Sequence, residues 1–96
     1  MHARVTTLHG TPAEADGGIE NFRTNVVPYV RDEGKGAILL VDRASGEAIA
    51  ITLWEDEQAM LASEESANTL RANAANQMGV TDSPSVARYE VAVFEV

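Results

Sequence analysis

The stretch GAILLVDRASGEAIAITLW (residues 36–54) predicts two apolar β-strands joined by a tight turn. Ala37 to Val41 and Ala48 to Trp54 supply the strands, because both runs are rich in Ile, Leu and Val. Between them, residues 43–46 (RASG) are turn formers, and Gly46 stands at the position that tolerates a positive φ. We therefore expect an antiparallel β-hairpin.

The register of this hairpin follows from a four-residue loop, which puts Leu40 opposite Ile49 and Ile38 opposite Ile51 on one face. A hairpin with one face in water alternates apolar with polar residues, yet neither face of this one is polar along most of its length. Both faces are therefore predicted to be buried. The second face carries Ala37, Leu39, Val41, Ala48, Ala50, Thr52 and Trp54.

The length of the chain, 96 residues, predicts a single domain (residues 1–96) with a small core. Two predicted helices are enough to cover one face of the sheet, so we expect a partner subunit on the other and predict a homodimer. The alanine-rich face, with the indole of Trp54 at its end, suits a hollow for a small ligand. Alternatively, the alanines let a helix pack closely against the sheet.

The composition excludes several classes of partner and chemistry. Seven basic and fifteen acidic residues give a formal charge of −8, which repels nucleic acids and anionic membrane surfaces. The absence of cysteine excludes disulfides, thiolate catalysis and cysteine metal sites. No signal-peptide core and no run of eighteen apolar residues is present, so we expect a cytoplasmic protein.

The first third of the chain predicts a strand over His2 to His9 and then a helix. Residues 11–14 (TPAE) have the pattern of a capping box, although Asp16 is an alternative cap for a later start. Pro28 lacks the N–H of a regular helix, so it should kink the helix or begin its irregular end. The apolar positions at helical spacing are Ile19, Phe22, Val26 and Tyr29 or Val30.

The last part of the chain predicts a second helix and a fourth strand. Asp56 is the expected N-cap, Gly79 the expected end, and Ser63 to Ser66 a candidate interruption. Val86 to Val96 then alternates as a strand does. The order β-α-β-β-α-β is that of an α+β, ferredoxin-like fold with a four-stranded antiparallel sheet. The second helix is marked by Met60, Ala67, Leu70, Ala74 and Met78.

Several short motifs resemble the antibiotic biosynthesis monooxygenase (ABM) superfamily. They are residues 26–28 (VVP), 36–42 (GAILLVD), 51–55 (ITLWE) followed by Ala59, and 89–91 (YEV). The resemblance implies a dimeric α+β barrel, in which two four-stranded sheets face each other and the helices lie outside. This arrangement agrees with the burial of both faces that the hairpin predicts.

The resemblance also implies a choice of activities, because the superfamily includes cofactor-independent oxygenases of anthrones and quinols, haem-degrading enzymes and proteins that process quorum signals. In the oxygenases a tryptophan and polar side chains bind a phenol whose deprotonated form reacts with oxygen, and Trp54 matches that tryptophan. The haem-degrading members add an asparagine on the first strand and a histidine in the second helix. Here the first strand has Thr6 and Thr7, and the second helix has no histidine, so we expect no haem degradation.

Trp54 is the residue most suited to a ligand, because its flat ring fits an aromatic molecule and its N–H offers one donor. The same residue would look no different in a plain core or in a dimer interface. On the helix expected to roof the hollow, Asn25 and Tyr29 are the polar residues placed to orient a substrate. The predicted ligand-binding set is Trp54, Thr52, Phe22, Asn25, Val26 and Tyr29.

The sequence contains two histidines, His2 and His9. His9, at the end of the first strand, is a candidate general base, although such a residue is more often simply solvated. No metal-ligand spacing and no phosphate-binding glycine motif is present, so we expect neither a metal nor another cofactor.

Two functions from different classes follow. The first is a dimeric, cofactor-independent monooxygenase that binds an aromatic, anthrone-like or quinol-like substrate. The alternative is a non-catalytic dimer for ligand sensing, storage or protein interaction, which the shortage of polar catalytic candidates favours. A protein with no pocket follows if the alanine-rich face is close-packed.

Overall fold

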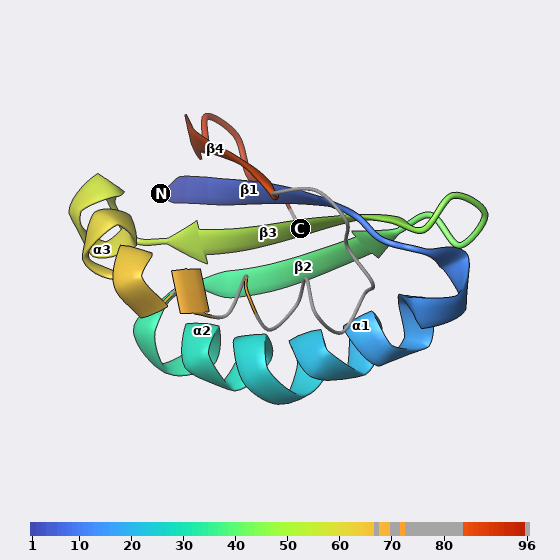
Figure 1. The fold of residues 1–96 in the computed structure, drawn as a ribbon. Coiled ribbons are helices and arrows are strands. Elements are labelled where there is room, and N and C mark those ends of the chain that lie inside the picture. The colour runs from blue at the N-terminus through green and yellow to red at the C-terminus, as the bar shows by residue number, and fades with distance from the viewer. Residues whose placement is uncertain (67, 70–71, 73–83, 96) are drawn as a thin grey trace.

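The protein forms a four-stranded antiparallel sheet with its longest helix along one face (Figure 1). The computed structural model describes residues 1–66, 68, 69, 72 and 84–95. The strand order is β2-β3-β1-β4, which is the ferredoxin-like order predicted from the sequence. The strands are β1 (His2–His9), β2 (Gly36–Val41), β3 (Glu47–Trp54) and β4 (Ser85–Glu90).

The β2–β3 hairpin has the predicted register. Leu40 pairs with Ile49 and Ile38 with Ile51. Gly46 ends the turn with a φ of 85°, and a Cβ built there would lie 2.5 Å from the carbonyl oxygen of Gly10. Glycine is needed at this position both for the backbone angle and for the close approach of the chain that follows β1.

The first helix begins at the predicted position, but with a different local geometry. It starts as a 3₁₀ turn, η1 (Pro12–Glu14), and continues as α1 (Ala15–Asn21). Thr11 is the N-cap residue and Pro12 follows it, as predicted, but the Thr11 side chain makes no capping hydrogen bond in the described part of the chain. The alternative cap, Asp16, lies inside α1 and does not cap it. The backbone N–H of Glu14 donates instead to the carbonyl oxygen of Thr11 at 3.0 Å, which closes the tight turn without a side chain.

Pro28 lies inside the helix and does not end it. The turn before it, η2 (Phe22–Val26), is a π-helix, and α2 (Val27–Glu33) then continues to Gly34. The N–H of Val27 donates to the carbonyl oxygen of Phe22, five residues earlier. The predicted irregularity is confirmed, but it precedes the proline. The wider turn accommodates Pro28, which has no N–H to donate to an earlier carbonyl group.

The second helix begins as predicted. The carboxylate of Asp56 accepts the N–H of Ala59 at 2.8 Å, and α3 (Glu57–Ala62) follows. Ser63 interrupts it, and residues 64–66 are helical again. The predicted continuation, marked by Ala67, Leu70, Ala74, Met78 and Gly79, lies outside the described residues.

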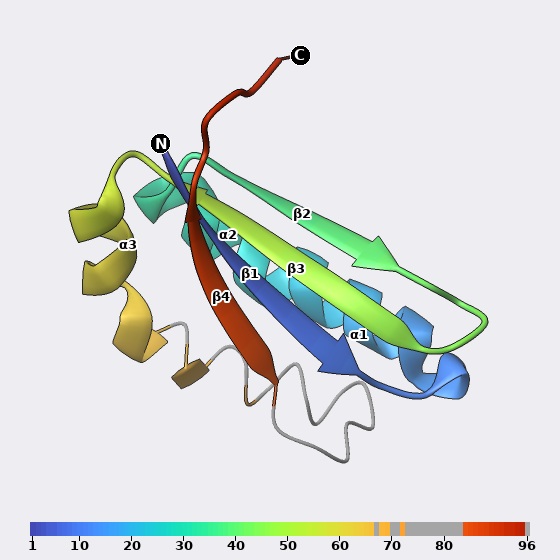
Figure 2. The ribbon, with the colours of Figure 1, turned by 90° about the horizontal axis from the view of Figure 1, so that it is seen from above.

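The fourth strand is shorter than predicted. It ends at Glu90, whereas Val86 to Val96 was expected, and residues 91–95 have no regular secondary structure. Its partner β1 starts at His2, so the described chain offers these residues no strand to pair with beyond one bond from the N–H of Val91 to the carbonyl oxygen of Met1. Figure 2 shows this segment leaving the sheet toward the C-terminus.

The core lies between the sheet and the first helix, which Figures 1 and 2 show running beneath β2 and β3. Ala37 and Ala50 pack against it, as expected of small residues under a closely packed helix. On the other face of the sheet Ile38 and Leu40 are 40% and 50% exposed, so this chain buries one face of the hairpin by itself. The buried core residues are Phe22, Val26, Val30, Trp54 and Met60.

Candidate functional site

Trp54 ends β3 and is the centre of the buried cluster. It is 1% exposed and packs with Phe22 and Val26 of the first helix and with Met60 of α3. The ring of Tyr29 meets the indole edge-on, with 6.3 Å between centroids and 60° between planes. Four predicted ligand-binding residues are thus brought together at one end of the sheet.

Trp54, Thr52 and Asn25, three polar members of the predicted set, are hydrogen-bonded within the protein. The indole N–H of Trp54 donates to the hydroxyl of Thr52 at 3.0 Å, because residues two apart on a strand share a face. Asn25 donates from its side-chain amide to that of Asn21 at 2.7 Å on the flank of the helix. A ligand that uses the indole N–H or this hydroxyl must therefore compete with an existing hydrogen bond.

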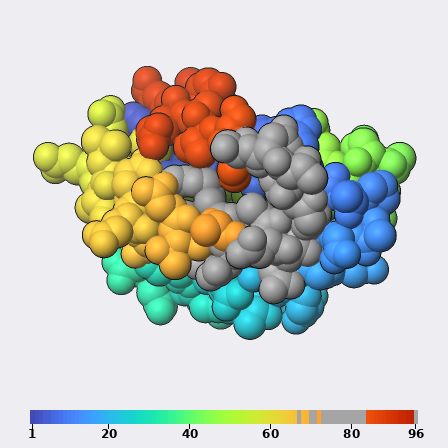
Figure 3. All heavy atoms as spheres, viewed as in Figure 1, coloured from blue at the N-terminus to red at the C-terminus, as the bar shows by residue number. Residues whose placement is uncertain are grey.

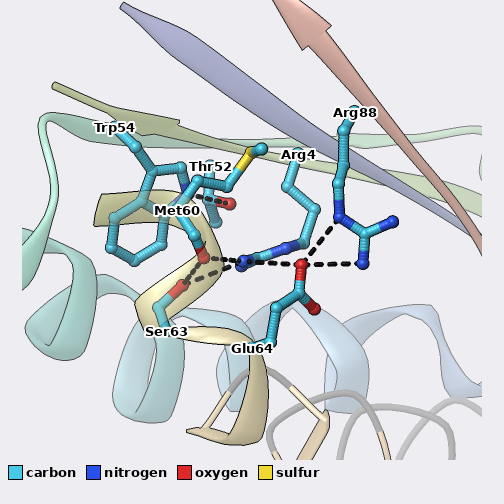
Figure 4. A network of polar contacts seen from close by, with 7 residues as sticks. All are labelled: Arg4, Thr52, Trp54, Met60, Ser63, Glu64 and Arg88. Atoms are coloured by element: carbon cyan, nitrogen blue, oxygen red, sulfur yellow. Dashed lines mark hydrogen bonds and ion pairs between the residues drawn. The ribbon is translucent and has the colours of Figure 1, made fainter. Parts of the chain in front are cut away.

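Arg4 of β1 is a buried charge that the sequence interpretation missed. It is 3% exposed, and its guanidinium carbon lies 5.4 Å from the centroid of the Trp54 ring, within the range of a cation–π interaction. One guanidinium nitrogen donates to the carbonyl oxygen of Met60 at 2.6 Å and to the hydroxyl of Ser63 at 2.9 Å. Figure 4 shows the guanidinium between the oxygens of Met60 and Ser63 on one side and Glu64 on the other.

Glu64 joins this arginine to a second one. Its carboxylate lies 3.3 Å from a guanidinium nitrogen of Arg4, and it accepts from the Nε of Arg88 at 2.7 Å. The network therefore connects β1, β4 and the residues after α3, as the dashed lines of Figure 4 show. It places permanently charged groups beside a large aromatic ring, an arrangement suited to an aromatic ligand that carries a negative oxygen.

The sequence contains a weak indication of the buried Arg4, but none of its partner Glu64. Arg4 and Leu8 are four residues apart on β1, so their side chains share a face of the sheet, and Leu8 is buried. The arginine thus occupies a position expected to face the core. A buried arginine needs a carboxylate. Sequence spacing does not say that Glu64, sixty residues away, supplies it.

The two histidines lie at opposite ends and on opposite faces of the sheet. His9 pairs with Glu47, is 54% exposed, and is seven residues along β1 from the strand position opposite Trp54, or about 23 Å. His2 is that opposite residue. The structure does not bring His9 to the Trp54 cluster, and its role as a base stays a prediction.

The surface around the site contains a groove of about 280 Å³ between the start of β1, β4 and α3. Figure 3 shows the molecule from the side of Figure 1, with β4 (red) next to α3 (yellow). Within the described residues, no group of three or more potential metal ligands occurs. The groove is lined by His2, Glu57, Met60, Leu61, Arg88, Tyr89 and Glu90.

None of the helices that the structure describes is both long and apolar enough to span a membrane. The cytoplasmic location stays a prediction.

Solved structures of antibiotic biosynthesis monooxygenases have the same fold. A monooxygenase from the Streptomyces coelicolor gene ActVA-Orf6, in complex with nanaomycin D, matches 99% of this chain and 92% of its own with a TM-score of 0.75. A Deinococcus radiodurans protein provisionally assigned to this class matches 100% of this chain and 97% of its own, with a TM-score of 0.74. Both are 17% identical in sequence, so the predicted resemblance is confirmed at the level of the fold.

The sequence relatives are longer proteins of Mycobacterium tuberculosis. The uncharacterised protein Rv2557 of strain H37Rv is 38% identical over 94 residues, which are 96% of this chain and 41% of that protein. The uncharacterised protein Rv2558 is 42% identical over 77 residues, or 78% of this chain and 33% of that protein. The chain thus spans less than half the length of these relatives, and no family model matches it.

Proposed function

We propose that this chain is a dimeric, cofactor-independent monooxygenase that binds a small aromatic molecule beside Trp54. The observation that carries the proposal is the stacking of the Arg4 guanidinium on the indole, under a helix that supplies Tyr29. Such a site offers an aromatic wall and a permanent positive charge to a phenol that must lose its proton. The nanaomycin D complex of a protein with the same fold supports an aromatic, oxygen-bearing ligand.

In this proposal the ligand enters between the first helix and the sheet and displaces side chains that now fill the space. Trp54 stacks on its ring, and Phe22 and Val26 provide the apolar roof. Thr52, Asn25 and Tyr29 bind its oxygens. Because Arg4 is held by Met60 and Ser63, its charge is preorganised and does not have to be oriented when the phenolate forms.

The dimer is proposed from the sheet face opposite the helices. Ile38 and Leu40 are exposed there, and Ile51 pairs with Ile38 in the middle of the same face. Exposed apolar side chains gathered on one surface are typical of an interface. A second copy of the chain is the occupant that the ABM-like fold supports, and a monomeric mass by light scattering at micromolar concentration would contradict it.

The proposal is tested by a thermal-shift screen with anthrones and quinols, followed by oxygen uptake. A ligand at one hundred times its dissociation constant adds about 2.7 kcal/mol to the free energy of unfolding if it binds only the folded state. We expect a shift with one aromatic class and its loss in Trp54→Ala. Trp54→Phe is the matched control, because it keeps an aromatic wall without the N–H. Unchanged affinity and turnover in both variants would remove the role of Trp54.

A second candidate is a non-catalytic dimer that senses or stores a ligand. The internal bonding of the site favours it, since the Trp54 N–H and the Thr52 hydroxyl are bonded to each other and Arg4 is held by three residues. Under this hypothesis a ligand shifts the melting temperature but consumes no oxygen. Turnover that a single substitution in the site abolishes would defeat it.

A further inference from the structure

We infer that His2, held by Glu57, is the group that accepts the proton of the phenol in the reaction proposed above. His2 begins β1, and its strand partner on β3 is Trp54. Directly opposite residues of an antiparallel pair point to the same face with their Cβ atoms about 5 Å apart. His2 and Trp54 therefore leave the same face of the sheet from opposite positions, at the end where the ligand is proposed to bind.

The two nitrogens of this imidazole have different surroundings. Nε2 lies 3.6 Å from a carboxylate oxygen of Glu57, the first residue of α3. Nδ1 is buried, and among the residues that the structure describes it has no hydrogen-bond partner. Buried polar atoms normally have partners. A nitrogen left without one is suited to a partner that arrives with the ligand.

The tautomer follows from the carboxylate. A hydrogen on Nε2 points its positive charge toward Glu57, which leaves Nδ1 with the lone pair and makes it the acceptor. The Nε2 to carboxylate distance of 3.6 Å is longer than a hydrogen bond, so this contact tightens when the imidazole becomes charged. Glu57 is thus a positioning residue, because it acts through His2 and not on the ligand.

His2 also lines the groove described above, between β1, β4 and α3. It has a volume of about 280 Å³, and Met60, one of its lining residues, also packs in the cluster of Trp54. The charged groups along it are Glu57 on α3 with Arg88 and Glu90 on β4. Met60 therefore belongs to both the groove and the aromatic cluster, and His2 lines the groove with it.

The step is a simple proton transfer. The O–H bond of the phenol breaks, an N–H bond forms at Nδ1, and the products are a phenolate and an imidazolium beside the carboxylate of Glu57. The phenolate is the electron-rich species that the proposed reaction with oxygen requires. No group other than the ligand and the two side chains takes part in this transfer.

The experiment uses the full chain with 1,4-dihydroxynaphthalene as the probe. Without oxygen, the absorption of the phenolate reports whether the bound molecule is deprotonated, and this readout needs no turnover. With oxygen, an electrode follows oxygen consumption. The variants are His2→Gln, which cannot accept a proton, His2→Ala, Glu57→Gln, and His9→Gln as the same change at the other histidine.

We expect His2→Gln to bind the probe as the neutral phenol and to lose oxygen consumption by about 100-fold or more, the usual contribution of a general base. Added imidazole should restore part of the rate in His2→Ala, which also shows that this variant is folded. Glu57→Gln should bind the probe with less phenolate and a smaller loss of rate.

Phenolate formation and oxygen consumption in His2→Gln within twofold of the original chain would overturn the inference, as would a loss confined to His9→Gln. The inference rests on the proposed function, and the two failures are distinguishable. If the original chain neither binds the probe nor consumes oxygen with it, the proposed function fails and this role for His2 fails with it.

Discussion

The two faces of the sheet contrast in how completely this chain covers them. On the helical side Trp54 is 1% exposed and Arg4 is 3% exposed; the indole N–H donates to Thr52 and a guanidinium nitrogen donates to Met60. On the other side Ile38 and Leu40 remain exposed although they belong to the same hairpin. One face of this apolar hairpin is thus packed in the core of the chain, and the other face is exposed.

Because of this contrast, substitutions on the two faces should affect different properties of the protein. A substitution on the helical side removes packing and hydrogen bonds that the folded chain has already made, so its cost appears in the unfolding of a single chain. A substitution on the open side removes contacts that only a second molecule could make. Its cost should appear in assembly, and the following variants separate the two.

Trp54→Ala should have the largest effect on stability. Removing a buried aromatic side chain typically costs about 3 to 5 kcal/mol, and Trp54 packs with both helices. Urea unfolding followed by circular dichroism measures the loss, with Trp54→Phe as a control that should lose less. A loss below about 1 kcal/mol in Trp54→Ala would show that the helical side is not a packed core.

Arg4→Ala should have the next largest effect on stability. Breaking a buried ion pair costs about 3 to 5 kcal/mol, and the lower end is expected because Glu64 keeps its contact with Arg88. Arg4→Met is the matched control, since it fills similar space without a charge and should be less damaging. The same urea titration gives both values. Equal losses in the two variants would assign the cost to the lost charge and its hydrogen bonds and not to volume.

Thr52→Val should have a smaller effect, about 1 kcal/mol, because it leaves the buried indole N–H of Trp54 without its acceptor. Thr52→Ser keeps the hydroxyl and serves as the control. The maximum or the width of the tryptophan fluorescence emission should change in the valine variant, because the indole loses its hydrogen-bond partner. No difference between the two variants would mean that this hydrogen bond adds nothing to stability.

Ile38→Glu should change the folding of the single chain least, by about 0.5 kcal/mol or less, because the side chain is exposed. It should nevertheless abolish the proposed dimer. Leu61→Glu is the matched control, since Leu61 is 48% exposed but lies on α3. Light scattering gives the mass, and the melting temperature should rise with protein concentration in Leu61→Glu and not in Ile38→Glu. Dimers in both variants would place the interface elsewhere.

Local features were predictable because neighbouring residues decide them. The hairpin register follows from the loop ending in Gly46, and the start of α3 follows from Asp56 and its bond to a backbone N–H three residues on. Thr11 stands at the predicted N-cap, but its backbone carbonyl and not its side chain accepts the first hydrogen bond, because the helix starts as a 3₁₀ turn. The fourth strand was predicted too long because alternation does not reveal where the partner strand begins.

By itself the sequence determined the order of strands and helices, the pairing of β2 with β3, and an aromatic residue at the end of β3. These depend on turn chemistry, on spacing along the chain and on residue size. Only the tertiary structure decided that Arg4 stacks on Trp54, that Glu64 bridges Arg4 and Arg88, and that His2 and not His9 stands at the Trp54 end. These contacts join residues far apart along the chain, and strand order and register, rather than local preference, bring them together.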